Sequence, residues 1–160
     1  MLKIIFVLVS ISYSLSIQNK EEYLEYCNDS FGFCIKYPKD FLKQPESGNR
    51  DGTTFLSKDK FSKIWAYGRL AIEGLDEIKQ EFDIATEGIK LTYKVIGDNW
   101  FIFSGVNSNG VIIYQKTCKK KIEYFGSTDT YAFQTLRISY PLNQKKQYES
   151  YCKLIAKSFQ

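Results

Sequence analysis

Few residues in this sequence can carry out acid–base or nucleophilic chemistry. The 160-residue chain contains no histidine. This absence excludes Ser-His-Asp and Cys-His catalysis, imidazole general-base chemistry and nearly all zinc sites. A hydrolase that uses paired carboxylates remains as an alternative, with Asp51, Asp59, Glu73 and Glu123 as its candidates. Such a pair needs a defined separation and unequal environments, which no spacing here indicates, so we predict no catalytic residue.

Oxygen ligands for a cation are also sparse. Calcium usually takes about six or more oxygens. The nearest grouping in the sequence is Glu46, Asn49, Asp51 and Asp59, which is too thin to predict a site. We therefore predict no metal ligand and no cofactor.

The four cysteines are Cys27, Cys34, Cys118 and Cys152. An even number in an exported protein is typical of disulfides, and neither a Cys-x-x-Cys motif nor zinc-like spacing occurs. Several pairings are possible. We favour Cys27–Cys34, because the two residues flank one turn. We also favour Cys118–Cys152, because Cys118 ends a strand that the last helix could cover and Cys152 lies on the apolar face of that helix. Free structural thiols or a thiol active site are the alternatives.

The first residues predict export. A basic start at Met1–Lys3 precedes a short apolar run, Ile4–Ile11, and small residues follow in Ser14–Ser16. These are the three parts of a secretory signal peptide, so we predict residues 1–16 as the signal and 17–160 as one mature domain, periplasmic or secreted. An N-terminal core strand or helix is the alternative. A cut after Ser16 is the expected processing step.

Composition indicates an ordinary globular domain. Hydrophobic residues make up 44%, charged residues 25% and aromatic residues 16%, the last favouring sheets. The net charge of +4 is too small for a nucleic-acid binder. The sequence contains no further long apolar stretch after Ser16, so we predict no membrane span. We expect a monomer. The basic cluster Lys119–Lys121 is either a solvated loop or a contact with an anionic surface.

Periodicity predicts six or seven strands and three helices. Phe31, Phe33, Ile35 and Tyr37 alternate with polar or small residues, as in a half-buried strand that Pro38 ends. The expected strands are residues 31–37, 53–57, 63–69, 89–95, 100–106, 111–118 and 131–140. The expected helices are residues 18–27, 75–87 and the C-terminal segment that Asn143 would cap.

Two segments carry most of the predicted core. Trp100–Val106 is apolar at successive positions, which indicates a central strand covered on both faces, with Trp100, Phe101, Ile102 and Phe103 buried. Asn107–Gly110 is a hairpin turn. Ile155 anchors an apolar stripe on the last helix, formed by Tyr148, Tyr151, Cys152, Ile155, Ala156 and Phe159. The predicted class is α+β: a six- to seven-stranded antiparallel sheet with helices packed on its faces, an α/β/α sandwich.

Two tracts resemble the PsbP-like/Mog-like fold group of small exported proteins. Phe31–Pro38 with Phe41 resembles its FGFxIxYPxxF opening. Asn49–Phe55 resembles its NGDGxxF loop and strand, with Arg50 where glycine is usual. The order and spacing of the remaining strands, through Tyr140-Pro141 and Ser158-Phe159, are also similar. The resemblance covers most of 26–160.

The resemblance implies an antiparallel sheet between helices and a role in binding. Named relatives bind a small GTPase or belong to the photosynthetic oxygen-evolving complex, and none is known as an enzyme through this fold. Function resides in sites and not in folds, so no binding residue is transferred. We predict a non-enzymatic, exported binding or accessory module whose partner is a protein or small ligand.

The long connection Lys39–Gly52 is the expected partner-binding loop, with Glu46, Asn49, Arg50 and Asp51 as its candidate residues. A merely flexible surface loop is the alternative. Asn28-Asp29-Ser30 is a glycosylation sequon, which matters only in a eukaryotic source.

Overall fold

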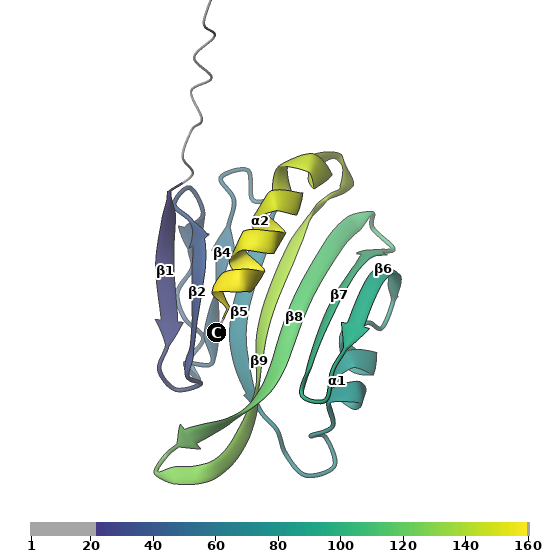
Figure 1. Cartoon of the computed structure of the whole chain (residues 1–160). Coiled ribbons are helices and arrows are strands. Elements are labelled where there is room, and N and C mark those ends of the chain that lie inside the picture. Colours follow the sequence, from purple (N-terminus) through teal and green to yellow (C-terminus); the bar gives the residue numbers. More distant parts are fainter. Residues whose placement is uncertain (1–21, 160) are drawn as a thin grey trace, which may run out of the picture.

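The computed structural model describes residues 22–159 and consists of one large sheet with helices on both faces. The predicted signal peptide, residues 1–16, lies outside this range. Seven strands form the large sheet in the order β3-β4-β5-β9-β8-β7-β6, and every neighbouring pair is antiparallel. A separate hairpin, β1-β2, packs against the same face of this sheet as the C-terminal helix (Figure 1). The predicted α+β class and the six- to seven-stranded antiparallel sheet are confirmed, but the predicted strand 31–37 lies in the hairpin and β3 was not predicted.

The strands of the N-terminal half are β1 (Tyr23–Asn28), β2 (Phe33–Pro38), β3 (Leu42–Lys43), β4 (Gly52–Leu56) and β5 (Lys63–Leu70). Helix α1 (Ile78–Ala85) follows, shorter than the predicted 75–87. The C-terminal half contains β6 (Ile89–Ile96), β7 (Trp100–Asn107), β8 (Val111–Tyr124) and β9 (Ser127–Pro141). A 3-10 turn (Leu142–Gln144) leads into α2 (Lys145–Ser158).

Two hydrophobic cores lie on opposite faces of the sheet. The larger core joins the sheet to α2 and the β1-β2 hairpin and includes Phe55, Leu136 and Ile155. The smaller core joins the sheet to α1 through Phe82, which meets Phe101 and Phe103 edge-on. Figure 1 shows α2 lying diagonally across one face, with α1 beside β6 and β7.

The segment predicted as the first helix is a strand where the structure describes it. Tyr23–Asn28 forms β1 and pairs residue by residue with β2. Its sequence is polar enough for a helix, but Tyr26 and Asn28 point inward at strand spacing and the pairing with β2 decides the conformation. The prediction was wrong because local composition did not reveal the tertiary partner.

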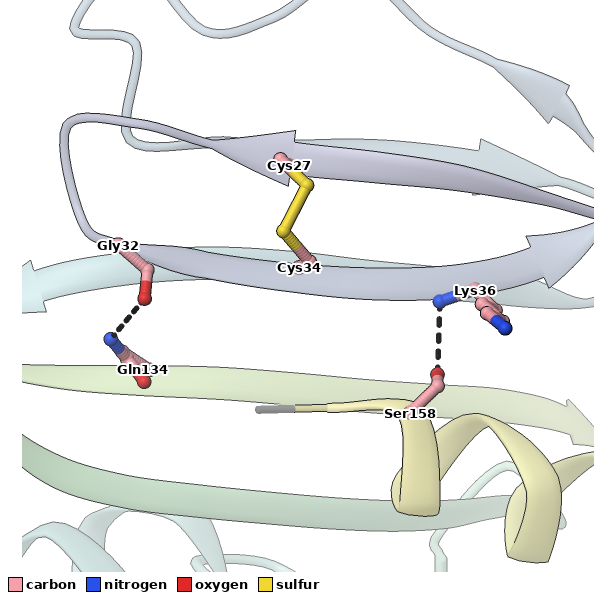
Figure 2. Close-up of a disulfide and its surroundings, with 6 residues drawn as sticks. All are labelled: Cys27, Gly32, Cys34, Lys36, Gln134 and Ser158. Carbon is pink, nitrogen blue, oxygen red and sulfur yellow. Dashed lines mark hydrogen bonds between the residues drawn. A yellow bond between two sulfur atoms is a disulfide. The ribbon is translucent and has the colours of Figure 1, made fainter.

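The hairpin β1-β2 carries the only disulfide among residues 22–159. Cys27 and Cys34 are directly opposite one another, with Cα atoms 4.1 Å apart, so this pairing is confirmed. Figure 2 shows how the other edge of β2 is held. The side-chain amide of Gln134 donates to the Gly32 carbonyl at 3.1 Å, and the Lys36 amide donates to the Ser158 hydroxyl at 2.9 Å.

The predicted Cys118–Cys152 disulfide is wrong, because both cysteines are free thiols. Cys152 lies opposite Tyr140 and Tyr114, whereas Cys118 is four residues further along β8 than Tyr114. Four residues of strand span about 13 Å. The helix has already ended at that level, since Lys116 donates to the last carbonyls near the C-terminus. Sharing a face of the sheet did not bring the thiols together.

Three further predictions need correction. Strand β7 is buried on one face through Phe101 and Phe103, but Trp100 and Ile102 on its other face are only half-buried, because α2 packs on β8 and β9 and does not cover β7. Asn143 does not cap α2: the N-cap residue is Gln144, and its side chain makes no capping hydrogen bond to the helix. The segment Lys119–Lys121 is part of β8 and not a loop.

Candidate binding site beside the C-terminal helix

A groove of about 510 Å³ lies between α2 and the strands β6, β7 and β8. Ligand pockets commonly enclose about 300–1,000 Å³ and are mainly apolar and aromatic. The groove fits that description, with three tyrosines, aliphatic side chains and a few polar groups along its walls. It is lined by Thr92, Tyr93, Ser104, Gly105, Val106, Ile112, Tyr114, Tyr140, Leu142, Lys145, Glu149, Cys152 and Lys153.

The groove exists because α2 covers only part of the sheet. The apolar stripe of α2 packs against β2, β8 and β9, and Ile155 is fully buried there. The neighbouring stripe, Lys145, Glu149 and Lys153, repeats every four residues and therefore forms one side of the helix. This stripe faces the groove, so charged groups line one wall and the sheet provides the other.

The floor of the groove holds neutral polar groups. The Cys152 thiol donates to the Tyr140 hydroxyl over 3.9 Å, and Tyr140 stacks on Tyr148. Burial raises the pKa of the Cys152 thiol to about 11 and that of the Tyr114 hydroxyl to about 12. The thiol is therefore protonated at neutral pH and is a poor nucleophile. The floor can accept apolar or neutral polar groups, but it lacks an activated nucleophile.

Strand β6 forms the outer wall and is an edge of the sheet. Within residues 22–159 it pairs with β7 alone, so its other edge presents unpaired backbone groups. Its side chains are unusually exposed for their apolar character: Tyr93 is 54% exposed and Val95 is 38% exposed. Their partners in register, Ser104 and Ile102, place both on the groove side of the sheet. A bulge at Thr92 separates this part of β6 from Lys90.

The predicted partner loop is built as an ordered turn. Asp51 accepts a hydrogen bond from the Ser47 hydroxyl, and the Asp51 carbonyl accepts the Gly68 amide at 2.7 Å. The Arg50 carbonyl accepts the Asn28 side-chain amide at 2.9 Å. Glu46 pairs with Lys43 at 3.6 Å. The loop therefore belongs to the fold, and Glu46, Asn49, Arg50 and Asp51 lie away from the groove lining.

Arg50 occupies a glycine-like conformation. Its φ angle is 53°, in the left-handed region where side chains are disfavoured. Glycine adopts this conformation without steric cost, so the arginine side chain makes the turn locally less favourable.

The remaining sequence candidates do not assemble into a site. Asp59 holds the turn after β4 by accepting from the Ser57 hydroxyl and the Phe61 amide, interactions that lower its pKa. Strand β4 lies between Asp51 and Asp59 and separates them by about 17 Å along the chain. Among residues 22–159, no group of three or more His, Cys, Asp or Glu side chains could hold a metal ion.

The lysine cluster is divided by the strand that carries it. Successive strand residues point to opposite faces, so Lys120 is directed away from Lys119 and Lys121. Lys119 pairs with Asp76 at 3.0 Å, and Lys121 pairs with Asp129 at 2.8 Å. These pairings weaken the anionic-surface hypothesis.

The sequon asparagine is also committed to the fold. Asn28 is 5% exposed, and its side-chain oxygen accepts the Phe31 amide at 2.9 Å. Its amide nitrogen donates to the Arg50 carbonyl. A glycan on that nitrogen would disrupt the contact between the hairpin and the loop.

Comparison with known proteins identifies the architecture. No protein-family model matches the sequence, and no curated protein sequence is significantly similar to it. None of the helices between residues 22 and 159 has the length and apolar character needed to cross a membrane. Among solved structures, the fold is similar to the solution structure of cyanobacterial PsbP (CyanoP) from Synechocystis sp. PCC 6803, with a TM-score of 0.60 and 12% identity. The match covers 96% of this chain and 98% of that chain. The sheet with helices on both faces therefore constitutes a PsbP-like fold.

Proposed function

We propose that this protein is an exported, non-catalytic binding module that takes an extended segment of a partner protein along β6, with an apolar side chain in the groove beside α2. The observation that carries the proposal is the coincidence of three features at one place: an unpaired strand edge, exposed apolar side chains and an adjoining groove. Addition of a strand to a sheet edge uses main-chain hydrogen bonds for affinity and side-chain pockets for specificity.

Charge favours an acidic partner segment. Lys145 and Lys153 line the groove with Glu149 between them, and Lys90 lies on the same face beside Val106. The rim therefore carries more positive than negative charge. A peptide with an apolar anchor and acidic flanks complements both the groove and its rim. Like charges on Lys90 and Lys94 oppose pairing of β6 with a second copy of itself, whereas an acidic partner segment meets no such repulsion.

The fold supports a binding role in place of catalysis. The PsbP-like fold is compatible with an accessory role, and the groove floor offers a protonated thiol and not a nucleophile. The disulfide in the β1-β2 hairpin suits an oxidising compartment outside the cytoplasm. Reproducible turnover of any substrate by the pure protein would overturn the non-catalytic part of the proposal.

The test is peptide selection followed by variants of β6. A displayed library of random peptides is selected on the protein, and the affinity of a selected peptide is measured by calorimetry. Tyr93→Ala and Val95→Ser should each weaken binding by at least about tenfold, or 1.4 kcal/mol. Tyr131→Ala is the matched control, because Tyr131 is also a strand tyrosine and is 45% exposed. Equal losses in the control, or no loss at β6, would contradict the proposal.

A further inference from the structure

A second hollow, of about 450 Å³, lies beside Trp65 on the other face of the sheet. Its walls come from the loop before β4 and from β4 and β5 themselves. It is open to solvent, and its lining combines one large aromatic surface with hydroxyl and carboxylate groups. The residues are Pro45, Ser47, Asp51, Gly52, Thr53, Thr54, Trp65 and Tyr67.

Trp65 is exposed because helix α1 does not reach it. The helix docks on Phe101 and Phe103 of β7, and its last carbonyls extend only to Arg137, which donates to Ala85 at 3.4 Å. Trp65 is the next residue in that row, opposite Arg137 on one side and Thr54 on the other. The indole is 43% exposed. A large apolar ring is thus presented to solvent on a rigid strand.

The polar side of the hollow is held in place. At Gly52 an added Cβ would lie 2.1 Å from the Ala66 carbonyl, so only glycine allows the loop to approach β5 this closely. Next to it, the Asp51 carbonyl accepts the Gly68 amide, and the Asp51 carboxylate accepts the Ser47 hydroxyl. The carboxylate is therefore oriented beside the hollow before any ligand arrives, which lowers the ordering cost of binding.

We propose that the Trp65 hollow binds a neutral saccharide. A pyranose has an apolar C–H face that can stack on the indole, and hydroxyls at its edge that can donate to the Asp51 carboxylate. A purely apolar ligand would offer no hydrogen bond to the Thr54 hydroxyl or to the oxygen of the Asp51 carboxylate that Ser47 does not occupy. An anionic ligand would meet repulsion from Asp51. The site is separate from the groove beside α2, which lies on the opposite face.

The test uses a set of trisaccharides as probes: those of N-acetylglucosamine, glucose in β-1,4 linkage, glucose in α-1,4 linkage, and mannose. Binding is detected by ligand-observed NMR up to about 10 mM, and affinity is measured by calorimetry, since surface saccharide sites bind weakly. At least one probe should bind. Trp65→Ala should weaken its affinity at least tenfold, and Asp51→Asn should weaken it severalfold; both variants are checked by thermal unfolding.

Two controls separate this inference from the proposed function. Tyr93→Ala, on the other face, should leave saccharide binding unchanged, and Trp65→Ala should leave peptide binding at β6 unchanged. A milder variant, Trp65→Phe, should retain part of the saccharide affinity if stacking is the cause. Binding of none of the probes, or binding that survives Trp65→Ala, would overturn the inference.

Discussion

Replacing Phe103 with alanine tests the packing that supports α1. The Phe103 side chain is fully buried. Its ring lies 6.1 Å from that of Phe101 and 6.1 Å from that of Phe82 on the helix. The smaller core contains only a few large side chains, so the neighbours have little freedom to close a cavity. The ring is thus the link between β7 and α1.

The expected loss in the free energy of unfolding is about 3–5 kcal/mol, the range for phenylalanine-to-alanine changes in protein cores. Lost burial of the ring supplies most of it, and the two aromatic contacts add about 0.5–1.5 kcal/mol each within that total. Ile102→Ala is the matched control on the same strand. Ile102 is half-buried on the opposite face, and its truncation should cost only about 1 kcal/mol.

Urea unfolding followed by circular dichroism measures both values, and unchanged denaturant slopes show that the same structure unfolds in each variant. A loss below about 1 kcal/mol for Phe103→Ala would contradict the prediction, because it would place the ring outside a tightly packed core. Equal losses at Phe103 and Ile102 would show instead that both faces of β7 are covered.

Four further predictions follow from the structure and the sequence. Replacing Cys27 and Cys34 with serine should lower the free energy of unfolding by about 2–3 kcal/mol, because the disulfide closes a short loop with a sequence separation of 7. An unchanged free energy of unfolding after reduction of the disulfide would be inconsistent with this prediction. Arg50→Gly should raise stability by about 0.5 kcal/mol by relieving the left-handed conformation, net of the greater freedom of unfolded glycine, and a measured loss would contradict it. Burial raises the pKa of the Cys152 thiol from 9.0 to about 11, so the stability that the protonated thiol contributes is present below pH 9.0 and is lost as the pH rises to about 11. Over that pH range the free energy of unfolding should fall less steeply in Cys152→Ala than in the unaltered protein, and identical slopes would contradict this prediction. Mass spectrometry of the natively exported protein should find a mature N-terminus at or within a few residues of Ile17, and an intact first methionine would exclude the predicted signal peptide.

Features that depend on local periodicity could be predicted from the sequence. The Asn107–Gly110 turn is confirmed by the left-handed Gly110 and its hydrogen bond to Asn107. The stripe on α2 is confirmed because Tyr148, Cys152 and Ile155 are all buried. In both cases the residues that determine the structure are close together in the chain.

Features that depend on distant contacts could not be predicted. Strand β1 forms because β2 pairs with it, and the thiols of Cys118 and Cys152 stay apart because the helix ends short of Cys118. The groove escaped prediction for the same reason, since its lining comes from β6, β7, β8, β9 and α2. The sequence shows that the predicted strand 89–95 contains apolar residues, but not that Tyr93 and Val95 are exposed beside a groove.

The most direct test of the proposed function is amide hydrogen exchange of β6 with and without a selected peptide. The outer edge of β6 has no strand partner within residues 22–159. We predict slower exchange across β6 on peptide binding, with no change in β3 at the opposite edge of the sheet. Unchanged exchange in β6 when the peptide is bound would show that the partner does not extend the sheet, which would contradict the proposed binding mode.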